Sequence, residues 1–230
     1  LYTAQIRDTE NPLVPLPIQY SDYAQWQRDW LQGDVLDKQL GYWKKQLSNL
    51  PVVHGLPLDY PRPALQSFKG ASIVHQLPGD LYTALQQLAK RHDATFFMLM
   101  NAAFASFVGR YSGETDIVIG SPIANREQSE LAPLIGLFIN NLVLRSDLSG
   151  DPSFVDLLAQ CKERTLEAQE HQQAPFSKLV DELQPARNLS HSPLFQIMLI
   201  LQNPQVEALN LPGVNTKQLN TSVSFAQYDL

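Results

Sequence analysis

Residues 116–145 constrain the fold most, because two apolar runs there flank a polar segment. The first run, residues 117–123, is short and rich in β-branched side chains. It ends in Gly-Ser-Pro, so it predicts a buried strand that meets a loop. Residues 124–130 carry most of the charge of this stretch. The second run, residues 135–144, is again apolar, so the stretch predicts two buried β-segments joined by a charged loop.

Asn140 and Asn141 interrupt the second run, where either face of a strand should be apolar. A buried amide without a partner costs roughly 1–3 kcal/mol, so at least one of the two needs fixed partners or a cavity. One interpretation is a β-bulge or strand end, at which the amides pair with neighbouring backbone. The other is that one amide lines a substrate channel, with Arg145 just beyond it. The sequence leaves both interpretations open.

Composition argues against several classes of protein. A net charge of −6 and a pI near 5.3 argue against nucleic acid or an anionic membrane as partner, because both require a basic face. The single cysteine, Cys161, excludes an internal disulfide, and its helical apolar surroundings favour a packed thiol over a nucleophile. The five histidines are scattered singly, without the spacing of a metal site. We expect no signal peptide or transmembrane segment and therefore a cytoplasmic protein.

Helical periodicity recurs along the chain. Ser21 is expected to cap a helix with an aromatic stripe at positions 23, 26 and 30. Thr95 is expected to cap a buried helix over residues 96–108, which stops before a left-handed Gly113. Asp151 and Pro152 form a cap and a first helical position for the clearest helix of the chain. Further helices are predicted at residues 1–7, after Gly33, after Pro78 and over 175–183.

Strand-like segments alternate with these helices, which favours an α/β fold. Residues 73–77 predict a short strand, and the continuous apolar run at residues 194–201 predicts a central one. Residues 222–225 alternate like a further strand. Residues 11–18 are rich in proline and predict an extended connector.

Five motif regions resemble those of one family. The pair GSPIANR, residues 120–126, and IGLFINNLVLR, residues 135–145, is similar to the paired motifs of nonribosomal peptide synthetase condensation domains. These domains belong to the chloramphenicol acetyltransferase-like superfamily. Within the second motif, FINN stands where FVNT is commoner, which places Asn141 at the threonine position.

The other three regions, one before and two after this pair, occur in the same order along the chain as in the family. YSDYAQW resembles YxDYAxW and contains Tyr20, Asp22 and Trp26. HQQAPF resembles HQDxPF and contains His171 and Gln172, with Gln173 where aspartate is usual. RNLSHSPL resembles RDxSxxPLF and contains Arg187 and Ser190, with Asn188 in place of aspartate. Aromatic residues, cap residues and lone histidines at such places are more often structural than catalytic, so we expect these motif residues to be structural.

The resemblance implies a chloramphenicol acetyltransferase-like lobe with a mixed β-sheet packed against helices, the second of two similar lobes. Residues 1–230 would form that C-terminal lobe, truncated at both ends, with residues 1–19 as the connector from the first lobe. Asn140 and Arg145, and less strongly Ser121, are the candidates for lining a substrate tunnel. The family's catalytic HHxxxDG motif does not occur in residues 1–230. No catalytic residue is therefore expected in this chain, and we expect the chain alone to be inactive.

The implied activity is amide formation between an acyl or peptidyl thioester on an upstream carrier protein and an aminoacyl amine on a downstream one. Both substrates would travel on 4′-phosphopantetheine, with no directly bound cofactor or metal. The implied partners are the two peptidyl carrier proteins, an adjacent adenylation domain and the N-terminal lobe. A related epimerisation or heterocyclisation domain, or a non-catalytic lobe that docks carrier proteins, is the alternative.

Overall fold

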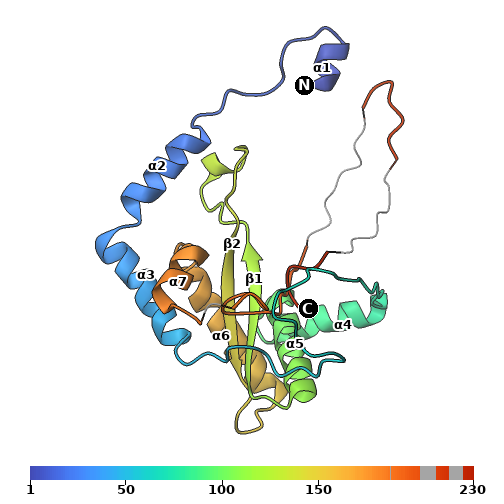
Figure 1. The fold of residues 1–230 in the computed structure, drawn as a ribbon. Helices are drawn as coiled ribbons and strands as arrows, with labels where there is room; N and C mark the ends of the chain where they lie inside the picture. The colour runs from blue at the N-terminus through green and yellow to red at the C-terminus, as the bar shows by residue number, and fades with distance from the viewer. Residues whose placement is uncertain (187, 203–210, 218–224) are drawn as a thin grey trace.

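The computed structural model describes residues 1–186, 188–202, 211–217 and 225–230. In these residues helices surround a central two-stranded ladder (Figure 1). The elements in chain order are α1 (Tyr2–Ile6), α2 (Tyr20–Trp30), α3 (Gly33–Gln46), α4 (Gly79–Arg91), α5 (Phe96–Ser112), β1 (Asp116–Ile123), the 3₁₀ helix η1 (Ser129–Leu131), β2 (Asn140–Asp147), α6 (Phe154–Glu170) and α7 (Phe176–Leu183).

The two apolar runs of residues 116–145 form the central hairpin. β1 and β2 pair antiparallel, from Asp116 opposite Asp147 to Ile123 opposite Asn140. The first run is a strand, as predicted, but the second becomes one only at Asn140. Ile135, Leu137 and Ile139 are 95%, 75% and 64% exposed, and of the large apolar residues of this run before the strand only Phe138 is buried, at 4%. The amide doublet therefore begins β2 instead of interrupting it.

Residues 194–201 were predicted as a central strand, and the structure corrects this. The segment does lie beside β1, where the Gly120 N–H donates to the Ile197 carbonyl at 2.8 Å and the Leu199 N–H donates to the Gly120 carbonyl at 2.9 Å. These bonds make one parallel bridge, between Gly120 and Met198, and the segment forms no regular strand. With the antiparallel hairpin, this bridge gives the mixed β arrangement that the fold class implies. Gly120 is required here because a Cβ would lie 2.2 Å from the Phe195 ring.

The strand predicted over residues 73–77 is also wrong. Ile73 and Val74 are 86% and 91% exposed, and within the described residues the segment pairs with no strand. Sequence alternation can indicate an extended segment, but it cannot supply the neighbour that a ladder needs. Of the strand expected over residues 222–225, only Phe225 is described, and it forms a bridge with Lys69.

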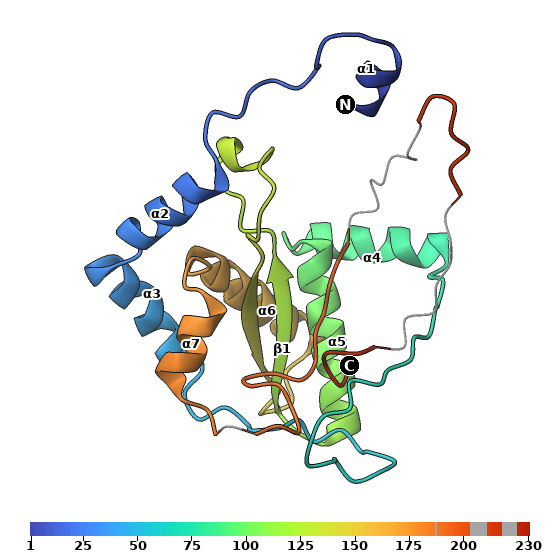
Figure 2. The ribbon, with the colours of Figure 1, turned by 45° about the horizontal axis from the view of Figure 1, so that its top comes forward.

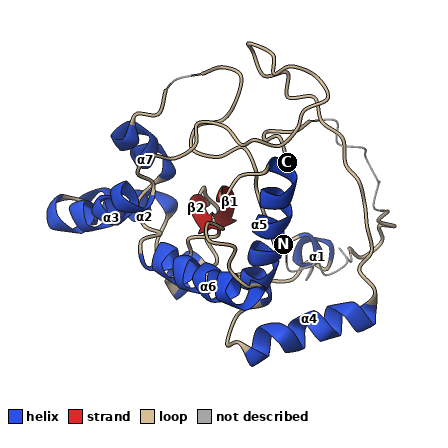
Figure 3. Ribbon diagram, turned by 90° about the horizontal axis from the view of Figure 1, so that it is seen from below, coloured by secondary structure: helices blue, strands red, loops and turns tan. Residues whose placement is uncertain are grey.

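The buried helix α5 behaves as predicted at both ends. The hydroxyl of Thr95 accepts a hydrogen bond from the Met98 N–H at 3.2 Å, and the helix stops at Gly113 with φ of 74°. Because α5 is apolar on most sides, it is covered by β1 on one side and by α4 and α6 on others. Figure 3 shows α5 and α6 flanking the strands, with α3 and α7 on a further side.

Two predicted helix starts are corrected. Helix α2 begins at Tyr20, so Gln19 is the cap position in place of Ser21. The Asp22 carboxylate fixes this start by accepting a hydrogen bond from the Gln19 N–H at 2.8 Å. Helix α6 is capped by Ser153, whose hydroxyl accepts from the Asp156 N–H at 3.3 Å. Asp151, with φ of 54°, belongs to the preceding turn.

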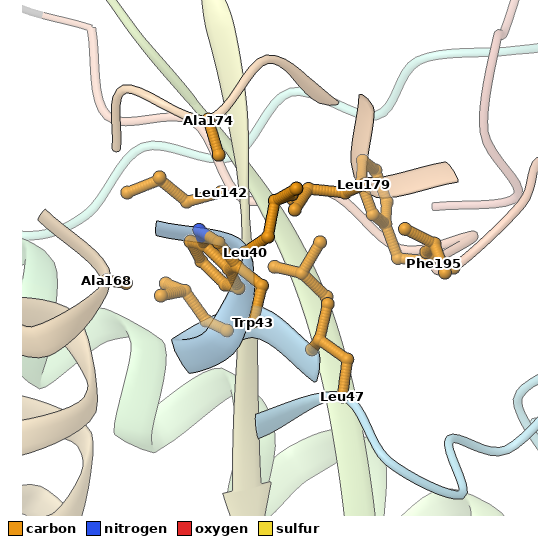
Figure 4. Close-up of a cluster of buried hydrophobic side chains, with 11 residues drawn as sticks. Leu40, Trp43, Leu47, Leu142, Ala168, Ala174, Leu179 and Phe195 are labelled. Carbon is orange, nitrogen blue, oxygen red and sulfur yellow. The ribbon is translucent and has the colours of Figure 1, made fainter. Parts of the chain in front are cut away.

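The largest hydrophobic cluster joins α3, β2, α6, α7 and the start of the 194–201 segment (Figure 4). Trp43 of α3 is 1% exposed at its centre, between Leu40 of the same helix and Leu47, which follows the helix end. Phe195 enters the cluster from the far end of the chain, and Figure 2 shows α7 lying alongside α3. This cluster fixes α6 and α7 against the beginning of β2, where the motif residues meet.

Candidate functional site

Asn140 connects the start of β2 to the turn between α6 and α7. Its Nδ2 donates to the carbonyl oxygens of Gln172 and Ala174, both at 2.8 Å. Its Oδ1 accepts from the N–H of Phe176 at 2.9 Å. The side chain is 9% exposed, and each polar atom of its amide is paired with backbone. For Asn140 this is the strand-end arrangement, in which the amide pairs with neighbouring backbone. A place for Asn140 in a substrate tunnel stays a prediction.

Arg145 holds the hairpin to the end of α3. Its Nε and Nη2 donate to the two carboxylate oxygens of Asp116, each at 2.8 Å. Its Nη1 donates to the carbonyls of Gln46 and Ser48 at 3.0 and 2.8 Å. A two-pronged arginine–carboxylate pair of this kind fixes orientation as well as charge. The guanidinium is thus committed to neighbours on β1 and beyond α3, and its tunnel role also stays a prediction.

His171 ends α6 and packs against α3. Its ring stacks on Tyr42 at a centroid distance of 4.1 Å, and its Nδ1 donates to the Glu167 carbonyl at 2.8 Å. Its own carbonyl accepts from Nε1 of Trp43 at 2.8 Å. Burial, and then the nearby Glu167 carboxylate, raise the pKa of Tyr42. These contacts give His171 a packing role between α6 and α3.

Gln172 and Gln173 of the same motif share one acceptor. The Gln172 amide donates to one carboxylate oxygen of Glu127, and Nε2 of Gln173 donates to the other at 3.1 Å. Glu127 lies in the loop after β1, so these two hydrogen bonds tie that loop to the α6–α7 turn. An aspartate at position 173, as in the family pattern, would instead bring a second negative charge towards Glu127.

The first motif supports the same loop from the other side. The Tyr20 hydroxyl donates to the Leu137 carbonyl at 2.9 Å, and its ring packs edge-on to Phe138 at 5.3 Å. A Cβ at Gly136 would lie 2.2 Å from the Tyr20 ring, so only glycine fits there. Trp26 is 41% exposed and stacks on Trp30 at 5.5 Å.

Arg126 is an organising residue that the sequence analysis did not single out. Its Nη1 donates to the carbonyls of Leu131 and, at 2.9 Å, Leu134. Its guanidinium lies 4.0 Å from the centroid of the Phe138 ring. The loop between the strands is therefore wrapped around one arginine. The available signal in the sequence was an arginine followed by closely spaced apolar residues. This signal does not distinguish an arginine that organises a loop from one that is exposed on it.

The remaining candidate residues either lie apart from the motif residues above or fall outside the residues that the structure describes. Ser121 is 5% exposed on β1, opposite Leu142. The Ser190 N–H donates to Oδ1 of Asn188 at 2.9 Å, so the amide that replaces the family's aspartate serves as a local acceptor. Arg187 lies outside the described residues.

A second polar cluster, also missed, joins the end of the chain to the loop after α3. Nε2 of His54 and Nη2 of Arg62 lie 2.9 and 2.5 Å from the same carboxylate oxygen of Asp229. Burial raises the pKa of Asp229, but the hydrogen bonds from Arg62 and His54 and the charge of Arg62 outweigh it, so the net pKa is lowered. Because Nδ1 of His54 accepts from the Leu56 N–H at 3.1 Å, the ring proton lies on Nε2 and no ring nitrogen is left to act as a base.

Other site classes find no support in the described part of the chain. Within it, no group of three or more His, Cys, Asp or Glu side chains could hold a metal ion. No helix there is long and apolar enough to cross a membrane. The pKa of the buried Cys161 thiol is raised by burial, which confirms the packed thiol expected from the sequence.

A cavity of about 270 Å³ lies where the motif segments meet, between α2, the loop and start of β2, and the beginning of α7. Its lining residues are Tyr23, Gln27, Asn125, Leu137, Phe138, Ile139, Asn140, Asn141, Gln173, Pro175, Phe176 and Ser177. Of the three tunnel candidates, only Asn140 lines this cavity. Arg145 lies five residues further along β2, and Ser121 lies on β1.

Comparisons with known proteins agree on one family. A family model described as the condensation domain matches residues 1–230. One of the linear gramicidin synthase proteins of Brevibacillus parabrevis is 47% identical over 232 residues, which cover 100% of this chain and 4% of that protein. Another protein of the same synthase is 51% identical over 214 residues, covering 93% of this chain and 3% of that protein. The chain thus spans only a few per cent of the length of these relatives.

Solved structures give the same fold. The X-domain from teicoplanin biosynthesis superimposes with a TM-score of 0.89 at 29% identity, over 99% of this chain and 52% of that one. A four-domain nonribosomal peptide synthetase bound to AMP and glycine superimposes with a TM-score of 0.75 at 31% identity, over 80% of this chain and 14% of that one. With the family model matched from the first residue to the last, the chain belongs to the condensation domain family of the nonribosomal peptide synthetases, whose function is peptide bond formation.

Proposed function

We propose that the chain is the second of two similar lobes in an amide-forming condensation domain, with residues 1–19 as the connector from the first lobe. The observation that carries the proposal is the family match over all of residues 1–230, with linear gramicidin synthase proteins as relatives at 47–51% identity. The superposition on the X-domain supports the division into lobes, because it uses 99% of this chain and 52% of the other.

In the proposed reaction, the amine of an aminoacyl group on a downstream carrier protein attacks the thioester carbonyl of an acyl or peptidyl group on an upstream one. The C–N bond forms and the C–S bond breaks. The upstream pantetheine sulfur leaves as a thiol, after taking up the proton that the amine loses. Each substrate is presented on a 4′-phosphopantetheine arm, and the thioester supplies the activation.

The partners in this proposal are the upstream and downstream peptidyl carrier proteins, the adenylation domain and the first lobe. We assign the work to the cytoplasm, where these synthetases are expected. A base or polar group that handles the amine proton is needed. Residues 1–230 contain no HHxxxDG motif, so that group is assigned to the first lobe.

The contribution of this lobe is the placement of the tunnel wall. Asn140 fixes the turn at residues 172–176 to β2, and Arg145 fixes β2 to β1 and to the end of α3. We assign Asn140 and Arg145 to the wall as positioning residues, with Ser121 as a further candidate on β1. A shift of about 1 Å in such a wall can cost about a hundredfold in rate.

The test uses the intact synthetase with its two carrier proteins chemically loaded with defined acyl and aminoacyl groups. Amide formation predicts an acyl-aminoacyl product on the downstream carrier, with the donor's α-carbon configuration unchanged. An inverted α-carbon without a new amide would indicate epimerisation, and loss of water from the new amide would indicate heterocyclisation. Carrier binding without any product would indicate a docking lobe. Each of these three outcomes contradicts the proposal.

A further inference from the structure

The cavity of about 270 Å³ is lined by carboxamides and hydroxyls, without a charged side chain among its described lining residues. Its polar lining residues are Tyr23, Gln27, Asn125, Asn140, Asn141, Gln173 and Ser177. Its apolar walls come from Leu137, Phe138, Ile139, Pro175 and Phe176. A neutral lining that combines donors and acceptors suits a neutral hydrogen-bonding group. The volume suits one side chain or peptide group and not a whole substrate.

The carboxamides of the lining differ in whether their donors and acceptors are already used in hydrogen bonds within the protein. Asn140 is committed to backbone, the Gln27 amide donates to the Tyr23 hydroxyl at 3.1 Å, and the Gln173 amide donates to Glu127. Within the described residues, no hydrogen bond is made by the side chains of Asn125 and Asn141. These two carboxamides therefore retain both a donor and an acceptor for a ligand. Of the asparagine doublet, Asn140 is structural and Asn141 is available.

Three of the four departures from the resembled motifs, all except Asn188, lie in this cavity. Ile139 and Asn141 are the two positions at which FINN differs from FVNT, and Gln173 replaces the aspartate of HQDxPF. Gln173 is far from the other two in sequence, yet all three line the cavity. The change at 173 leaves the lining without a charged side chain, and the change at 141 adds a carboxamide. A neutral lining with an added carboxamide suits a neutral group that can donate and accept hydrogen bonds.

We propose that this cavity is a subsite for an uncharged carboxamide or peptide group of the carrier-bound substrate, and that Asn141 and Gln173 set its preference for that group over a carboxylate. The preference follows from two contributions. Asn141 and Asn125 pair with a carboxamide in both directions. The Glu127 carboxylate, held beside the cavity by Gln172 and Gln173, repels a second negative charge. This inference rests on the proposed amide-forming function.

The test compares glutamine and glutamate, which have nearly the same shape and differ in charge. The intact synthetase is supplied with carriers loaded with glutaminyl or glutamyl groups, first at the acceptor and then at the donor position. Wild type should show a higher kcat/KM for the glutaminyl form at one of the two. Asn141→Thr should reduce that preference about two- to tenfold, as expected for one hydrogen bond. Gln173→Glu should increase it, because the added carboxylate repels the glutamyl group. Gln87→Glu adds the same charge to α4, away from the cavity, and should leave the ratio unchanged.

A binding measurement separates this inference from the proposed function. The methyl NMR signal of Ile139, which lines the cavity, should shift when N-acetylglutaminamide is added to the domain, and not with N-acetylglutamate amide. The shift should weaken in Asn141→Ala. Methyl shifts without any condensation product would overturn the proposed function and leave the subsite. Normal condensation with equal glutaminyl and glutamyl kcat/KM at both positions, or an Ile139 signal that responds to neither amide, would overturn the subsite.

Discussion

At the scale of single residues, two adjacent asparagines have different surroundings. Asn140 is nearly buried and has three backbone partners, whereas Asn141 lines a cavity and its carboxamide has no partner among the described residues. The doublet in the sequence indicated that at least one amide needs partners. It could not indicate which, because that depends on the turn at residues 172–176, which is distant in the sequence.

Asn140→Ala should destabilise the domain by roughly 1–3 kcal/mol. The change leaves two carbonyls and one N–H of the α6–α7 turn without their partner, and a lost hydrogen bond to a buried group costs about this much. Chemical denaturation of wild type and variant measures the difference. Asn188→Ala, which removes an asparagine from an exposed turn, serves as a control and should cost less. Equal stability of the two variants would show that Asn140 does not hold the turn.

Gln173→Glu should reduce stability at low salt by a few tenths to about 1 kcal/mol, because it places a second carboxylate beside Glu127. The loss should shrink at about 1 M salt, since both groups are near the surface and are screened. Glu127→Gln in the same background should restore stability. Thermal melts of the two single variants and the double variant, at two salt concentrations, check this. A loss that ignores salt and the second substitution would disprove the pairing.

At the scale of elements, the sequence predicted the helices better than the strands. Helix α5 was predicted from Thr95, an apolar run and Gly113, all of which act locally. Residues 73–77 and 194–201 had equally clear patterns, but a ladder requires a neighbour at the right distance and register, and no local pattern carries that. The loop over residues 124–139 depends on Arg126 and on Tyr20 from another helix, so its shape could not be predicted either.

The loop provides a test at this scale. Gly136→Ala should destabilise the domain by about 1–3 kcal/mol, because the new methyl group would overlap the Tyr20 ring and displace it from Leu137. Gly41→Ala is the matched control. It lies inside α3 with nothing within 4 Å of the added carbon, and it should stabilise the domain by up to about 1 kcal/mol. Opposite signs in thermal denaturation are expected, and a neutral Gly136→Ala would contradict the packing of Tyr20 on this loop.

At the scale of the whole molecule, side-chain contacts join segments that are distant in the sequence. The Asp229 cluster is one, since it ties residues near the end of the chain to the loop after α3. Its lowered pKa means that Asp229 stabilises the fold at pH values above its unfolded pKa of about 4. That contribution is lost as the pH falls through the lower folded value.

Asp229→Asn should therefore lower stability at pH 7 and have a smaller effect as the pH drops below about 4. Denaturant unfolding of wild type and variant between pH 7 and pH 3 measures the difference. Asp59→Asn, on the same exposed loop as Arg62, controls for the general effect of removing a carboxylate. A stability difference between wild type and variant that stays constant with pH would show that the ionised Asp229 does not stabilise the fold.

We propose that this chain is the positioning half of an amide-forming site and that the proton-handling group lies in the other half. The measurement that tests this most directly is single-turnover amide formation between loaded carrier proteins, followed by mass spectrometry of the downstream carrier. The intact synthetase should give the acyl-aminoacyl product, and purified residues 1–230 should give none above a no-protein control. Product from residues 1–230 alone, or its absence from the active, fully loaded synthetase, would contradict the account.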